Sequence, residues 1–265
     1  MLVGEVKIAE DADFTKLRNL CEIHEDWKVE YNKNNIMVWT KTTDLCDFKM
    51  LKLRSIFQDI TASTVFDVIN DPVYRKNWDI NMIEAYEICQ LSPNNDIGYY
   101  AMKVPKPLKN RDFVTERSWL DLGKEYLIFN HSVSHAAIPL KKNFVRGISY
   151  ITGYQITSLH GDCHLPGVQV TYVTQSDPRG KLPSWAVNKA ATILAPKLLS
   201  KLHKACIKYN SWKSNNDPLW KPWIYPEQNT LPKINYEDVM PFEVKESDEL
   251  IDETDALEED IMEED

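Results

Sequence analysis

Hydrophobic residues recur with a helical period between residues 183 and 209. They fall three or four positions apart, which places them on one face of a helix: Val187, Ala191, Leu194, Leu198, Leu202, Ala205 and Tyr209. Lysines recur at the same steps one position earlier, at Lys197, Lys201, Lys204 and Lys208. The pattern predicts one long helix with an apolar stripe beside a basic stripe. Pro196 lies inside it and predicts a kink near residues 192–194.

Upstream of this helix the pattern is mostly that of β-strands. The candidate strands are residues 27–32, 36–42, 48–57, 85–91, 98–104, 112–120, 125–134, 145–159 and 168–176. Short links between sequential strands predict an antiparallel sheet. The longest candidates predict a β-bulge, with Gly147 and Gly153 as its expected places. Short helices are expected over 13–25 and from Thr61 or Ser63 to about Asp71.

These elements predict an α+β fold, in which a curved antiparallel sheet carries one long helix across its concave side. Residues 1–12 are expected to be a lead-in, and residues 13–213 the folded domain. Residues 214–242 are a proline- and aromatic-rich extension, and residues 243–265 an acidic, disordered tail.

The charge of the chain is concentrated at its C-terminal end. Residues 243–265 contain 13 acidic residues and one lysine, so this tail has a net charge of −12. Because the whole chain has a net charge of −9, residues 1–242 have a net charge of +3. The five cysteines are scattered without CxxC spacing, and no apolar leader follows Met1. Together these features predict a reducing, cytoplasmic location.

Motifs for most kinds of chemistry are absent from the sequence. It has no glycine-rich phosphate loop, no GxSxG nucleophile elbow and no set of ligands at metal-binding spacing. The basic residues are not interleaved with aromatic residues in a nucleic-acid-binding pattern. We therefore expect no cofactor, metal or nucleic-acid partner, and a non-enzymatic function.

Three separated motifs point to a known family. They are DPVYRKNWD at 71–79, YYAMKVPKPLKNRDF at 99–113 and GKLPSW at 180–185. In this order and spacing they resemble the START (StAR-related lipid transfer) family, and within it the phosphatidylcholine-transfer branch. The resemblance implies a helix-grip fold, with a sheet-lined tunnel that holds one lipid and is closed by the C-terminal helix.

Apolar residues on the predicted strands and helix are the candidates for the tunnel wall. They are Met50, Leu53, Met102, Ile128, Ile156, Leu194 and Leu198, together with two aromatic residues, Tyr100 and Phe113. Side chains alternate between the two faces of a strand, so a slip of one residue reverses this assignment.

The resemblance also implies a headgroup site. Arg75 matches the family arginine that contacts phosphate, although pairing with Asp71 or Asp79 is an alternative. Tyr100 and Phe113 fall at two positions of an aromatic cage for a choline cation, and the third is Tyr154 or Tyr150. Tyr100 and Phe113 replace a tryptophan and a tyrosine of the choline-selective relative, a change that suits a pocket which also admits ethanolamine. An ordinary core role is the alternative for each aromatic residue.

A membrane contact is expected at the loop 135–143 together with the lysines of the long helix. In the loop, Ile138 and Leu140 lie next to Lys141 and Lys142, a composition typical of a segment that enters a membrane interface. The predicted function is therefore transfer of one phospholipid, phosphatidylcholine or phosphatidylethanolamine, between membranes by a cytoplasmic monomer. The alternatives are a lipid-sensing interaction module, transfer of a sterol or ceramide, and a helix-grip enzyme.

Overall fold

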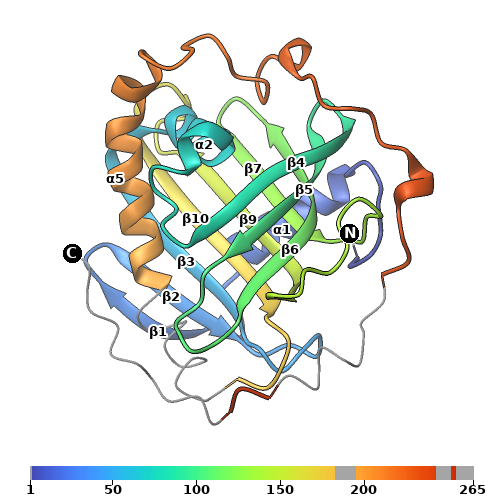
Figure 1. The fold of residues 1–265 in the computed structure, drawn as a ribbon. Helices are drawn as coiled ribbons and strands as arrows, with labels where there is room; N and C mark the ends of the chain where they lie inside the picture. Colours follow the sequence, from blue (N-terminus) through green and yellow to red (C-terminus); the bar gives the residue numbers. More distant parts are fainter. Residues whose placement is uncertain (1, 183–194, 243–251, 255–265) are drawn as a thin grey trace.

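The computed structural model describes residues 2–182, 195–242 and 252–254, and its centre is one curved sheet (Figure 1). The strands are β1 (Lys28–Lys33), β2 (Ile36–Lys41), β3 (Met50–Thr61), β4 (Met82–Ser92), β5 (Asn95–Met102), β6 (Asn110–Asp121), β7 (Glu125–Ser132), β8 (Phe144–Arg146), β9 (Ile148–Ser158) and β10 (Pro166–Asp177). Their order in the sheet is β1-β2-β3-β10-β9-β7-β6-β5-β4, and neighbours on this path whose registers are defined run antiparallel. The short β8 lies beside β6 in parallel. The predicted α+β fold with a curved antiparallel sheet is confirmed.

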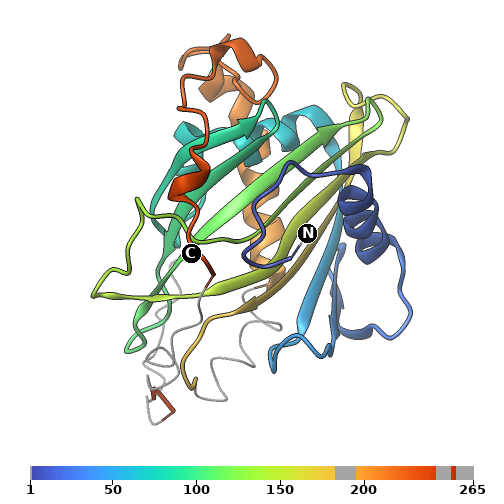
Figure 2. The same ribbon diagram turned by 90° about the vertical axis from the view of Figure 1, so that its right-hand side faces the viewer.

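Helices pack on both faces of the sheet. The N-terminal helix α1 (Asp11–Glu22) contacts β7, β9 and β10 on the outer face, as Figure 2 shows. The C-terminal helix α5 (Ala195–Lys213) contacts β2, β3 and helix α2 (Ala62–Asn70) on the inner side. Because successive side chains of β3 point to opposite faces, Lys52 donates hydrogen bonds to carbonyl oxygens at the end of α1, whereas Leu53 packs in the core below α5. None of the described helices is both long and apolar enough to cross a bilayer.

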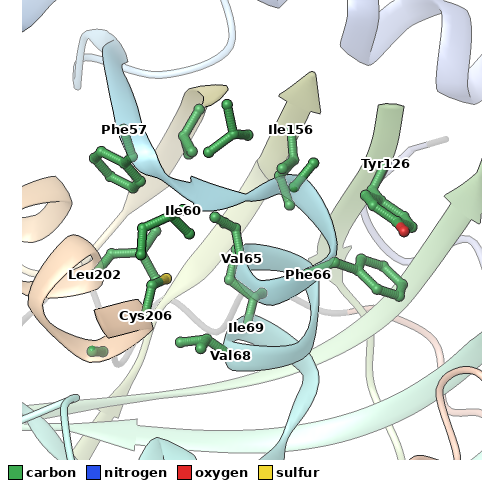
Figure 3. Packing of buried hydrophobic residues seen from close by; sticks show 14 of the residues in the cluster. Phe57, Ile60, Val65, Phe66, Val68, Ile69, Tyr126, Ile156, Leu202 and Cys206 are labelled. Carbon is green, nitrogen blue, oxygen red and sulfur yellow. The ribbon is translucent and has the colours of Figure 1, made fainter. Parts of the chain in front are cut away.

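The main hydrophobic core lies between α2, α5 and the sheet (Figure 3). Thr61 begins α2 by accepting a hydrogen bond from the Thr64 amide at 3.0 Å, which satisfies one free N–H of the first turn. Phe66 of α2 stacks on Tyr126 of β7 with ring centroids 4.3 Å apart. Leu202 of α5 is fully buried in the same cluster, so α5 is held against α2 by apolar packing along its length.

A buried carboxylate fixes the C-terminal end of α5. Asp71 follows α2 and caps the short helix α3 (Pro72–Arg75) by accepting hydrogen bonds from the amides of Val73 and Tyr74. Its second oxygen accepts a hydrogen bond from the Tyr209 hydroxyl and pairs with the Lys213 ammonium, each at 3.0 Å. One carboxylate therefore holds α3 and the end of α5 together.

The extension after α5 packs on the body of the protein. Asp67 of α2 accepts hydrogen bonds from the indole N–H of Trp223 at 2.7 Å and from the ammonium of Lys221 at 2.6 Å. The chain then follows the outer edge of the sheet, where Gln90 of β4 exchanges backbone hydrogen bonds with Pro232 and Ile234. The extension thus covers an edge strand whose backbone groups would otherwise remain free for pairing.

Two local expectations differ from the structure. The predicted strand 145–159 is divided at Gly147 into β8 and β9, because β8 leaves β9 and pairs with β6. The β-bulge of β9 lies at Tyr150, since Ser149 and Ile151 oppose the consecutive residues Ser176 and Gln175 of β10. Gly153 instead gives α1 room, because a Cβ there would lie 2.7 Å from Leu17 Cδ1. The described part of the long helix covers Ala195–Lys213, and the expected kink near 192–194 lies outside the described residues.

The buried pair of Asp71 and Lys213 generates a stability prediction. The Lys213→Met variant leaves the Asp71 carboxylate buried without a cation, so we expect the free energy of unfolding to fall by about 3–5 kcal/mol. Urea denaturation measures this change. Lys28→Met is the matched control, because Lys28 pairs with Glu30 at the exposed surface and its loss should cost less than about 1 kcal/mol. Equal losses in the two variants would contradict a special role for the buried pair.

Candidate functional site

A cavity of about 520 Å³ lies between the concave face of the sheet, the α2–α3 region and α5. Side chains from β4, β5, β6, β7, β9 and β10 line it, together with Leu198 of α5. On β5 and β6, eight of the nine lining residues are cross-strand partners that form four pairs: Asp96 with Arg117, Gly98 with Thr115, Tyr100 with Phe113, and Met102 with Arg111. The cavity wall is therefore apolar and aromatic in the middle and charged at both ends of these strands.

Arg75 lies in this cavity at the end of α3. Asp71 and Pro72 begin α3, and the single turn that follows carries Arg75 to the lining. Its Nη2 donates to the Ile69 carbonyl at 3.0 Å, while its Nη1 lies 4.0 Å from the carboxylate of Asp79. The guanidinium is thus oriented by one hydrogen bond and only loosely paired, which leaves donors for an anionic group.

Aromatic side chains line the same cavity as Arg75. The Tyr100 hydroxyl donates to Asp79 Oδ2 at 3.0 Å, and Tyr154 packs on Tyr172 with ring centroids 4.8 Å apart. Burial raises the pKa of Tyr100, Tyr154 and Tyr172 above the ordinary tyrosine value, so these hydroxyls stay neutral at physiological pH. Sequence reasoning missed Tyr172. It lies directly opposite Tyr154 in the β9–β10 pairing, a relation that only the strand register reveals.

Of the predicted cage residues, Tyr100, Phe113 and Tyr154 line the cavity and Tyr150 does not. Tyr150 is the extra residue of the β9 bulge, so it leaves the alternation that places Thr152 and Tyr154 on the inner face. Phe113 lies directly against Gly147, because a Cβ at that glycine would be 2.4 Å from the ring. Of the two candidates for the third aromatic position, Tyr154 is therefore the one that lies at the cavity.

The predicted wall residues divide between the cavity, the main hydrophobic core and the hydrophobic cluster under α1. Met102, Ile128 and Leu198 line the cavity. Leu53 and Ile156 belong to the main core below α2 and α5, whereas Met50 packs in the cluster under α1. Met50 and Leu53 are three residues apart on β3, so they point to opposite faces, and the prediction for Met50 was wrong. Leu194 lies outside the described residues.

A stripe of polar side chains, which no sequence pattern predicted, crosses one wall of the cavity. Thr152 of β9 and Thr174 of β10 share a hydrogen bond at 2.8 Å, and each is linked to a serine, Ser149 at 3.1 Å and Ser176 at 3.4 Å. All four residues line the cavity. Since hydroxyls both donate and accept, the stripe can bind polar groups of a ligand while its own hydrogen bonds remain satisfied.

The predicted membrane segments lie on different sides of the molecule. In Figure 1 the loop 135–143 lies on the side away from α5, where His135 pairs with Val239 of the C-terminal extension. Ile138 is buried in a cluster with Tyr99, and Leu140 is exposed.

The two predicted loop lysines are not among the residues that line the cavity. Lys141 pairs with Glu84 at 2.9 Å, a contact that raises its pKa, and Lys142 is exposed. None of the described lining residues comes from this loop. The connection 103–109 between β5 and β6 contributes Val104 to the cavity instead.

The helix lysines form a separate basic surface. Lys197, Lys204 and Lys208 are exposed on α5, while Lys201 is half-buried. Partial burial, with Lys197 nearby, lowers the pKa of Lys201.

A curved antiparallel sheet around a mainly apolar cavity, with a C-terminal helix packed across it, defines the helix-grip class of ligand-binding proteins. The profile of the START domain family matches residues 7–213, and the chain belongs to this family.

Named relatives agree with this membership. START domain-containing protein 10 of Mus musculus is 43% identical over 230 residues, which cover 86% of this chain and 78% of that protein. Phosphatidylcholine transfer protein of the same organism is 29% identical over 189 residues, covering 70% of this chain and 86% of that protein.

Solved structures agree with the fold. The crystal structure of human STARD10 matches with a TM-score of 0.83 and 40% identity, over 90% of this chain and 96% of that one. Human StAR-related lipid transfer protein 5 matches with a TM-score of 0.67 at 18% identity, over 74% of this chain and 93% of that one, and shows the shared fold alone.

The hydrogen bond between Tyr100 and Asp79 can be tested without a ligand. Tyr100→Phe keeps the ring but removes a donor to a carboxylate beside the cavity, so we expect a loss of about 1.5–3 kcal/mol in unfolding free energy. Thermal or urea denaturation measures it. Tyr236→Phe, at a residue that is 60% exposed, is the matched control and should change stability by less than about 0.5 kcal/mol. A neutral Tyr100→Phe variant would show that the bond does not stabilise the fold.

Proposed function

We propose that the chain binds one phospholipid, phosphatidylcholine or phosphatidylethanolamine, in the cavity and transfers it between membranes without catalysis. The observation that carries the proposal is a loosely paired arginine, Arg75, inside a mainly apolar and aromatic cavity. The names of the relatives, which include a phosphatidylcholine transfer protein, support the same ligand class.

The physical need for such a cavity follows from the ligand. A two-chain lipid has roughly 30 methylenes, and exposing each to water costs about 0.8 kcal/mol, so escape through water is opposed by more than about 20 kcal/mol. A protein that replaces the bilayer by an apolar lining removes most of this cost. Met102, Ile128 and Leu198 supply apolar lining in the described cavity.

The headgroup is assigned to the Arg75 region. The guanidinium offers two donors in one plane, which matches two oxygens of a phosphate. The faces of Tyr100, Phe113 and Tyr154 would surround the positively charged nitrogen group by cation–π attraction. Tyrosine and phenylalanine attract a cation less strongly than tryptophan, so this arrangement suits both choline and ethanolamine.

The membrane contact is assigned to α5, where Lys197, Lys204 and Lys208 are exposed. Each lysine contributes about 1 kcal/mol of attraction to an anionic membrane surface. The exposed Leu140 and Lys142 would form a separate contact, on the loop 135–143 that lies on the side away from α5 in Figure 1. The protein would act as a monomer in the cytoplasm that associates with membranes transiently.

Native mass spectrometry with lipid extraction tests the ligand and its anchor. We expect one phosphatidylcholine or phosphatidylethanolamine for each chain, and an affinity for phospholipid at least about tenfold lower in Arg75→Ala, since a charged hydrogen bond contributes about 1.5–3 kcal/mol. Lys76→Ala, at the exposed neighbouring residue, is the control and should retain the lipid. Retention in Arg75→Ala would refute the phosphate anchor. A sterol or ceramide in place of a phospholipid would support the alternative ligand class.

Transfer between vesicles tests the membrane contact. Replacing Lys197, Lys204 and Lys208 by glutamine should slow transfer to anionic vesicles by more than about tenfold, because about 3 kcal/mol of attraction is lost, and should leave transfer to neutral vesicles unchanged. The control replaces the exposed residues Lys16, Lys124 and Lys233, which gives the same change in net charge. An equal slowing in both variants would point to net charge alone. Bound lipid that never exchanges would favour the lipid-sensing alternative.

A further inference from the structure

A short piece of the acidic tail is bound at one end of the cavity. The Glu253 carboxylate accepts a hydrogen bond from the backbone N–H of Lys109 and another from Arg111 Nη2, both at 2.7 Å. Its own N–H donates to the Lys181 carbonyl at 2.9 Å, and Asp252 forms a β-bridge with Lys181. Residues 252–254 therefore occupy a defined position on the folded domain, at the foot of the molecule in Figure 1 (red).

The contact is made to a buried cation. Arg111 is 1% exposed and lines the cavity. Its other acceptors are the carbonyl oxygens of Pro178, Arg179 and Lys109, which orient the guanidinium but carry no charge. Among the residues that the structure describes, Glu253 is the only carboxylate within 4.0 Å of this guanidinium. A buried charge without a partner is costly, so the site is built to hold an anion.

The neighbouring carboxylates have other partners. Asp112, next to Arg111 in sequence, pairs with Arg146 at 2.8 Å, and Asp177 lies 3.7 Å from Arg179. Glu253 is therefore the carboxylate that completes the Arg111 site.

The bound tail joins two segments that belong to different parts of the sheet. Lys109 ends the connection between β5 and β6, whereas Lys181 follows β10, and two strands, β9 and β7, separate β10 from β6. Val104 of the first segment and Pro178 of the second both line the cavity. Glu253 thus connects two segments that both contribute to the cavity lining but adjoin strands, β6 and β10, that are not neighbours in the sheet.

We propose that residues 252–254 are an intramolecular latch on this end of the cavity, and that release of Glu253 from Arg111 speeds the exchange of bound lipid. This inference rests on the proposed function. The latch can open without unfolding the domain, because Lys181 and Asp252 are largely exposed and the tail is held by a few hydrogen bonds and one buried ion pair. A tail that is −12 in charge would thereby regulate the cavity through one specific carboxylate rather than through its net charge.

A reversible cross-link tests the latch. Bridge partners lie about 5 Å apart, within the range that a disulfide spans, so Lys181→Cys combined with Asp252→Cys can lock the tail in place. We expect the oxidised variant to transfer phosphatidylcholine between vesicles at least about tenfold more slowly than the same protein after reduction, with equal lipid bound. Lys181→Cys alone controls for the new thiol. Equal rates in the oxidised and reduced protein, with lipid bound, would overturn the latch and leave the proposed function intact.

A charge-neutral substitution provides the opposite test. Glu253→Gln removes the ion pair with Arg111 and should speed transfer several-fold. Glu237→Gln makes the same change in net charge at an exposed residue of the extension and should leave the rate unchanged. Equal acceleration in both variants would overturn the latch in favour of a general charge effect. A wild-type chain that neither binds nor transfers phospholipid would overturn the proposed function and the latch together.

Discussion

The carboxylate of Asp71 is the interaction on which the arrangement around the cavity depends. One oxygen caps α3, whose single turn carries Arg75 into the lining, and the other holds Tyr209 and Lys213 at the end of α5. The element that presents the arginine and the helix that packs across the sheet are therefore fixed to each other through one buried charge. Such a pair stabilises the fold only while both partners are present, because either charge alone is strongly disfavoured in the interior.

The alternation of side chains along the strands separates two environments within one sheet. Residues on the outer face pack under α1, and their neighbours on the inner face line either the cavity or the core below α2 and α5. The arginine side chains that line the cavity are each paired with a carboxylate. Arg117 is paired with Asp96, Arg111 with Glu253, and Arg75 more loosely with Asp79. The carboxylate of the loose pair accepts a hydrogen bond from Tyr100, one of the aromatic residues that line the cavity, which is why we assign the ligand's polar group to this pair.

Local pattern predicted much of the fold, and its failures have definite causes. The helix after Thr61 and most strands agree with the structure to within a few residues, because capping and period-two alternation are local properties. Tyr150 was placed in the cage because sequence does not reveal which residue of a long strand is the bulge. Met50 was placed in the wall because a strand's two faces are equivalent until helices cover them. For the loop 135–143, composition predicted a membrane segment but did not reveal that His135 pairs with Val239 of the C-terminal extension.

The sequence by itself determined the family, the α+β class, the candidate arginine and three of the aromatic residues that line the same cavity, because ordered motifs and periodic patterns are properties of the chain alone. The tertiary structure decided the rest. The pairing of Tyr172 with Tyr154, the stripe of hydroxyls, the fastening of α5 to Asp71 and the binding of Glu253 to Arg111 all join residues far apart in the chain. The register and curl of the sheet bring these groups together, and no local pattern encodes either one.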